Sequence, residues 1–143
     1  MRRMFLAVTG VALGLAFVVS MTVVRAEQAQ DAAVIDKAMK AVGPAFGAAR
    51  KALGAGMMAE AKTSAETLSK AFVETEAFFK SHGKADGVEL AQAAKKASDA
   101  IASAADADAA TAAAGELGKT CAGCHATYRD KAADGTFSFK PGA

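Results

Sequence analysis

Apolar residues between positions 27 and 143 recur every three or four residues in four segments, which short polar or glycine-containing stretches separate. This spacing places the apolar side chains on one face of a helix. It predicts helices over about 31–53, 57–81, 88–105 and 109–131. Helices of roughly 20 residues are each about 30 Å long. Joined by short connections, they predict an all-α fold, an antiparallel four-helix bundle.

Each predicted helix has a stripe of apolar residues that we expect to face inward. The four stripes consist of Val34, Ile35, Ala38, Met39, Val42, Phe46, Ala49 and Leu53; Met58, Ala61, Ala65, Leu68, Phe72 and Phe79; Val88, Ala91, Ala94 and Ile101; and Ala113, Leu117, Cys121, Cys124 and Tyr128.

Two local signals bear on where these helices bend and begin. Pro44, within VGPAFG, lacks an amide donor and clashes with the preceding turn, so we expect it to interrupt the first helix with a kink near 40–43. Asp106 or Asp108 is the expected N-cap of the last helix.

Residues 1–26 have a different pattern. Two arginines precede an apolar run over residues 5–24, and Ala26 ends the sequence VRA, which suits a signal-peptide cleavage site. The pattern predicts a secretory signal peptide over 1–26 and one domain over 27–143. The alternative is an uncleaved membrane anchor, because the run is close to the roughly 20 residues that a spanning helix needs. We expect membrane association only in that case.

Composition supports the helical interpretation. The chain is rich in alanine, which costs least in a helix, and after residue 30 the β-branched residues that favour strands are sparse. We therefore expect no strand, and a flexible tail over about 132–143 in which Phe137 and Phe139 stay unplaced. Removing residues 1–26 takes away three arginines and no acidic residue, so the net charge changes from +2 to −1. That balance argues against nucleic acid as a partner.

The only two cysteines and one of the two histidines lie together in CAGCH, residues 121–125. This is the C-x-x-C-H pattern of covalent haem attachment. On a helix, Cys121, Cys124 and His125 share one face. Two thiols can then add to the vinyl groups of a porphyrin while the imidazole reaches the iron from the same side. The pattern predicts one covalently bound haem c, with its iron, near the C-terminal helix.

Three other roles for the cysteine pair stay open, each with an argument against it. A disulfide across so small a loop gives little stabilisation. A thiol redox pair belongs with a βαβ pattern, which this sequence lacks. A zinc site made from two cysteines and one histidine is one ligand short of the tetrahedral set.

The placement of CAGCHATYR on the last of four helices resembles the class II c-type cytochromes, which include cytochrome c′ and low-spin cytochrome c-556. The resemblance covers nearly all of 27–143 and is most specific in CAGCHATYR and in MKAVG of the first helix. It implies thioether links at Cys121 and Cys124 and His125 as the proximal iron ligand. It also implies that Tyr128 and Arg129 lie in the haem surroundings; the alternative for Arg129 is a solvated side chain. Many members are homodimers through helices 1 and 2.

The second axial ligand is the open question of the sequence. In the c-556 branch a methionine in the context of Met39 ligates the iron, whereas in cytochrome c′ an apolar residue usually occupies the distal position. Met39 is therefore the candidate distal ligand, and core packing is its alternative role. Two features depart from the family: Ile35 stands where an arginine is frequent, and Pro44 follows closely. His82, in SHGKADG, is a weak candidate ligand, and Met57 and Met58 are expected to pack or lie in a loop.

These features predict a periplasmic electron carrier, not an enzyme, with a low-spin haem ligated by His125 and Met39. Thioether sulfur favours ferrous iron and raises the reduction potential. Its expected partners are other redox proteins, met transiently. The alternative is a five-coordinate, cytochrome c′-like protein that binds NO or CO, and a third reading is a haem-free helical interaction protein. RRMFL also resembles a twin-arginine signal, but a cofactor attached outside the cytoplasm favours export of the unfolded chain.

Overall fold

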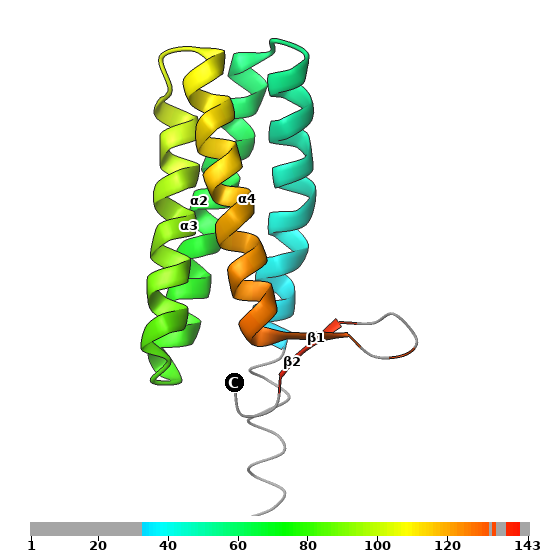
Figure 1. Ribbon diagram of the computed structural model, residues 1–143, viewed down its shortest axis with the longest axis vertical. Helices are drawn as coiled ribbons and strands as arrows, with labels where there is room; N and C mark the ends of the chain where they lie inside the picture. Colours follow the sequence, from blue (N-terminus) through cyan, green and yellow to red (C-terminus); the bar gives the residue numbers. More distant parts are fainter. Residues whose placement is uncertain (1–32, 132, 134–136, 141–143) are drawn as a thin grey trace, which may run out of the picture. The chain divides into compact units, whose positions relative to one another are not determined.

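The computed structural model describes residues 33–131, 133 and 137–140. Residues 33–54 form the first helix, and three more helices follow: α2 (Met58–Ser81), α3 (Ala85–Ser103) and α4 (Ala107–Tyr128). Turns of three residues join them, so consecutive helices run in opposite directions (Figure 1). The predicted four-helix bundle is confirmed. The expected start of the first helix at Asp31 lies outside the described residues.

The helix ends follow from local chemistry. The side chain of Asp106, not that of Asp108, caps α4 by accepting a hydrogen bond of 2.8 Å from the amide of Ala109. Gly56 and Gly83 have positive φ angles of 73° and 65°, which allows the two tight turns on either side of α2. The α2 helix matches its predicted range within one residue, whereas α3 begins three residues earlier than the apolar spacing predicted.

Pro44 does not break the first helix, because residues 33–54 are helical throughout. Proline removes the hydrogen bond to the carbonyl of Lys40, one turn earlier. Both Pro44 and Lys40 are exposed, so water can satisfy that carbonyl without breaking the helix.

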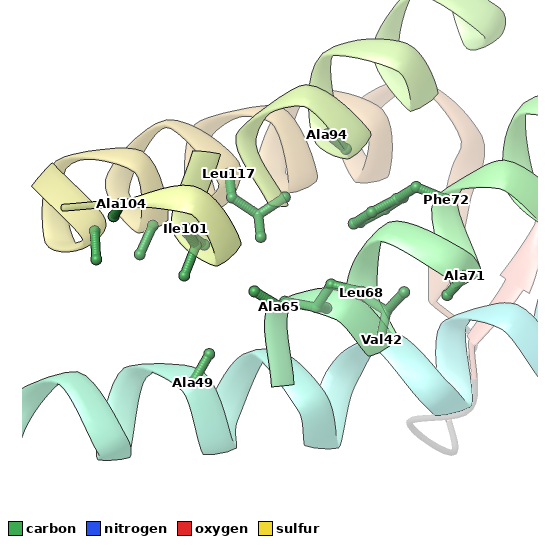
Figure 2. Packing of buried hydrophobic residues seen from close by; sticks show 12 residues of the cluster. Val42, Ala49, Ala65, Leu68, Ala71, Phe72, Ala94, Ile101, Ala104 and Leu117 are labelled. Carbon is green, nitrogen blue, oxygen red and sulfur yellow. The ribbon is translucent and has the colours of Figure 1, made fainter. Parts of the chain in front are cut away.

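The core consists mainly of small side chains with a few large ones between them (Figure 2). Leu68, Ile101 and Leu117 have no exposed surface. Alanines surround them and allow the helices to approach closely. The buried hydroxyls of Thr75 and Ser98 each donate to the carbonyl one turn before, so their burial leaves no polar atom unpaired. Most of the predicted inward positions are buried or half-buried; Val34 is an exception, with 49% of its surface exposed.

The end of α4 differs from the prediction. The helix ends at Tyr128 rather than near residue 131, and the chain continues as strand β1 (Arg129–Lys131). This strand pairs antiparallel with β2 (Phe137–Phe139), with Arg129 opposite Phe139. Part of the expected flexible tail is therefore a strand, and the expectation of no strand is wrong. Residues 132, 134–136 and 141–143 lie outside the described residues.

Pairing of the two strands brings Phe139 back to the bundle. Its ring contacts Phe78, Phe79 and Tyr128, with centroids 5.5–6.1 Å apart. Burial of this ring favours the hairpin over further helix. Among the described helices, none is long and apolar enough to cross a membrane. The predicted signal peptide falls outside the part of the chain that the structure describes.

Candidate functional site

One cavity brings together the chemistry that the sequence singled out. Met39 from the first helix and Cys121, Cys124 and His125 from α4 all border it. The volume open to the centre of a water molecule is only about 30 Å³, within about 340 Å³ of space not filled by atoms that includes the part open to solvent, so a group much larger than water would have to displace the side chains that line it. The other residues that line it are mainly apolar and come from all four helices: Val42, Phe72, Thr75, Leu90, Ala91, Ala94 and Thr120.

Helical spacing explains the α4 side of this cavity. Positions 121, 124 and 125 are three and four residues apart and face the same way, and all three side chains are half-buried. Cys121 packs against the main core, whereas Cys124 packs against a second cluster at the end of the bundle. The α4 helix thus presents two free thiols and an imidazole along one wall.

The thiols are held in the protonated form. Burial raises the pKa of the Cys121 thiol above its ordinary value. Burial, the neighbouring Cys121 and the carboxylate of Asp86 together raise the pKa of Cys124 to about 11. Zinc ligands and reactive redox cysteines need the thiolate, which positive neighbours normally stabilise. The surroundings of Cys121 and Cys124 oppose the thiolate instead, so either role would need a metal ion or a cation to stabilise it.

The surroundings of His125 favour the neutral form of its imidazole. Burial, followed by the positive charge of Arg129, lowers its pKa below the ordinary value. Arg129 is the C-cap of α4 and is exposed. Its backbone amide donates a hydrogen bond to the carbonyl of His125. A neutral imidazole has a nitrogen lone pair for a metal or for a proton.

Met39 is half-buried and packs against the main core, with Ile35 packing into the second cluster one turn earlier. Met58 also packs against the main core, whereas Met57 is exposed. Of the chain's methionines within the described ranges, Met39 is the one that lines the cavity.

His82 does not line this cavity. Its ring stacks on Phe78 with centroids 4.3 Å apart, and its Nδ1 lies 2.7 Å from the carbonyl oxygen of Phe78. Within the described ranges of the chain, no group of three or more His, Cys, Asp or Glu side chains is placed to hold a metal ion.

Tyr128 links the end of α4 to the start of α3. Its phenol donates a hydrogen bond to the carboxylate of Asp86. Burial and this carboxylate raise the pKa of Tyr128 to about 12, and the hydrogen bond from Tyr128 lowers the pKa of Asp86. Asp86 could not be predicted from the sequence. It lies between the predicted helices 57–81 and 88–105, and no local pattern relates it to Tyr128.

Sequence reasoning also missed part of the cavity wall. Thr75 falls on the inward face of α2, where it follows Phe72 by three residues. Helical spacing would have predicted Thr75 as an inward residue if the apolar stripe had been allowed to include threonine. Leu90 lines the cavity from α3 and would lie 3.8 Å from a β-carbon added at Gly123.

Comparison with protein-family models, with curated proteins and with solved structures finds no match for this chain.

Proposed function

We propose that this protein is a monohaem c-type cytochrome that transfers electrons, with the haem held by Cys121, Cys124, His125 and Met39. The observation that carries the proposal is the shared cavity. Met39 supplies a thioether to it, and residues 82 or more positions later, on α4, supply two thiols and an imidazole to the same apolar hollow. These are the donor types that hold a haem c with two axial ligands.

Covalent attachment at this site would need no oxidant. Each thiol would add its sulfur to one carbon of a vinyl group and its hydrogen to the other. The neutral imidazole of His125 would offer its lone pair to iron without first losing a proton. The spacing of 121, 124 and 125 on α4 supports attachment from one side. A haem bound here would supply an iron that alternates between the ferric and ferrous states.

The rest of the cavity would control access to that group. Phe72 and Val42 are buried and Leu90 is half-buried, so this part of the wall would give a bound haem apolar surroundings. A low local dielectric and a thioether ligand both favour ferrous iron and raise the reduction potential. If His125 and Met39 both held the iron in its two oxidation states, structural rearrangement would be small, which would suit rapid exchange with redox partners.

A second candidate is a five-coordinate, gas-binding protein for NO or CO. The observation that favours it is the apolar hollow itself, whose Met39 side is also lined by Val42 and Phe72. If Met39 packs rather than ligates, these side chains would leave the sixth position open to a diatomic molecule.

The partners and location follow from the same proposal. A signal peptide over 1–26 would deliver the chain to the periplasm, where transient redox partners would meet it. The resemblance to class II c-type cytochromes would make the protein a homodimer through helices 1 and 2.

The visible spectrum tests the proposal. The full chain is expressed in a host that attaches haem c, and the exported protein is reduced before and after carbon monoxide is added. A covalent haem with a sharp low-spin spectrum that ignores carbon monoxide supports electron transfer. A broad high-spin spectrum that shifts with carbon monoxide supports gas binding. An exported, folded chain without covalent haem rejects both, and the haem-free interaction protein then takes their place.

His125→Ala is the matching variant. It removes the imidazole and leaves both thiols, so we expect covalent haem with a disturbed ferric and ferrous spectrum. His82→Ala is its control, because His82 is the other histidine of the chain and lies outside the cavity.

A further inference from the structure

The last turn of α4 carries both His125 and Cys124, yet it lies at the end of a helix. Helix ends lack hydrogen-bond partners for their final carbonyls and tend to fray. Here, separate contacts hold the turn in place. The amide of Lys140 donates to the carbonyl of Tyr128 at 2.8 Å, and its ammonium group donates to the carbonyl of Ala126 at 2.7 Å.

The contact between Asp86 and Tyr128 is of another kind, since it reaches a different helix. The phenol of Tyr128 donates to the carboxylate of Asp86, 42 residues earlier, in the first turn of α3. Asp86 is exposed, so water competes for its carboxylate, but a hydrogen bond to a carboxylate is roughly twice as strong as one between neutral groups. The Tyr128 ring is itself buried, 4.6 Å from the ring of Phe79 between centroids. The ring packing and the hydrogen bond together leave the turn little freedom to rotate.

Tyr128 lies one turn after Cys124 on the same face of α4. Cys124 packs into the same apolar cluster as Tyr128. The carboxylate of Asp86 is also close enough to Cys124 to contribute to its raised pKa. The three side chains are therefore neighbours beside the cavity.

We propose that Asp86 is a positioning residue: by accepting the hydrogen bond of Tyr128, it holds the last turn of α4, and with it His125, in one orientation toward the bound haem. This inference rests on the proposed function. Rotation of the turn would tilt the imidazole and change the ligand field of the iron, because outer partners orient the groups that bind a metal. Asp86 itself does not touch the iron.

The test uses haem-loaded protein with Asp86→Ala, Asp86→Asn, Tyr128→Phe and the double variant Asp86→Ala/Tyr128→Phe. Glu89→Ala is the control, because Glu89 is an exposed carboxylate one turn further along α3. The readout is the electron paramagnetic resonance spectrum of the ferric protein, with the reduction potential beside it. Thermal unfolding of each variant is measured in parallel.

We expect one ferric species in the unchanged protein and in Glu89→Ala. Asp86→Ala and Tyr128→Phe should each split it into two or more species and broaden the redox titration. The double variant should be no worse than either single variant, since both remove the same bond. Asp86→Asn keeps an acceptor oxygen and should keep the single species. If Asp86→Ala does not fold, Tyr128→Phe and Asp86→Asn still carry the comparison.

Three results would overturn the inference. Lower unfolding temperatures with an unchanged ferric spectrum would make the contact merely structural. A disturbed spectrum in Asp86→Asn with a silent Tyr128→Phe would assign the effect to charge instead of position. Absence of covalent haem from the unchanged protein would reject the proposed function, and the positioning role with it; that failure is visible before any variant is made.

Discussion

The ring of Phe79 occupies the space that a β-carbon on Gly87 would fill. Phe79 lies near the end of α2 and Gly87 in the first turn of α3, so their contact sets how closely these helices meet. Phe79 also packs against Tyr128 and Phe139. The absence of one side chain therefore lets an aromatic cluster form beside Cys124.

Replacement of Gly87 by alanine should destabilise the protein, because the new methyl group overlaps a buried ring. Overpacking of this kind costs about 1–3 kcal/mol, and denaturant unfolding measures it. Gly115→Ala is the matched control: Gly115 is also helical, but no atom lies within 4 Å of an added β-carbon. Gly115→Ala should stabilise the helix by about 0.5–1 kcal/mol. Equal effects of the two substitutions would contradict the proposed packing.

Titration of Tyr128 can be followed directly, because it is the only tyrosine and the chain has no tryptophan. We expect phenolate absorbance to appear with a pKa of about 12 in protein made without haem. Asp86→Asn should lower this pKa toward the ordinary value near 10, since the carboxylate that opposes ionisation is gone. A pKa that stays the same in the variant would show that the negative charge of Asp86 does not act on Tyr128 in solution.

The same shift makes stability depend on pH. The folded pKa of Tyr128 lies above the unfolded one, so the folded chain binds more protons between about pH 10 and 12. Its stabilising effect is complete below the unfolded pKa and is lost as the pH rises through the folded pKa. Tyr128→Phe should show a shallower loss of stability over this range, measured by denaturant unfolding. Parallel curves for the two proteins would contradict this linkage.

The C-terminal hairpin should contribute to stability through Phe139. Phe139→Ala removes ring contacts with Phe78, Phe79 and Tyr128, although the side chain is only half-buried. We expect a loss of about 1–2 kcal/mol in the free energy of unfolding. Ser138→Ala is the control, because Ser138 is exposed in the same strand. An unchanged stability in Phe139→Ala would mean that the hairpin does not pack on the bundle in solution.

The helices could be predicted from the sequence because each buries one stripe of apolar residues. The period of that stripe, near 3.6 residues, is a local signal. The same period placed Met39, Cys121, Cys124 and His125 on inward or cavity-lining positions. The Asp106 cap was also readable, since capping needs only the residues beside it. The bundle and the residues proposed to bind haem could therefore be predicted from local sequence patterns.

The remaining features depend on contacts between distant parts of the chain. The helix α3 begins at Ala85, and its first turn places Gly87 against the ring of Phe79. In the sequence, a glycine at this position indicated a loop. The hydrogen bond from Tyr128 to Asp86 spans 42 residues. Strand β2 has only three residues, too few for a pattern, and the contacts of Phe139 with the aromatic cluster favour it. That the helix continues past Pro44 could not be predicted, because the exposure that makes proline tolerable there is itself a tertiary property.

Met39 decides between the two haem functions. Met39→Leu keeps the size and apolar character of the side chain but removes the sulfur. The free energy of unfolding should therefore change by less than about 1.5 kcal/mol. If the sulfur ligates iron, the haem-loaded variant becomes high-spin, binds carbon monoxide and has a lower reduction potential. Met58→Leu is the control, because Met58 packs against the core but does not line the cavity. A Met39→Leu spectrum identical to that of the unchanged protein would remove Met39 from the ligand set. The spectrum of the unchanged protein with carbon monoxide would then decide whether the sixth position is open to gas or filled by another group.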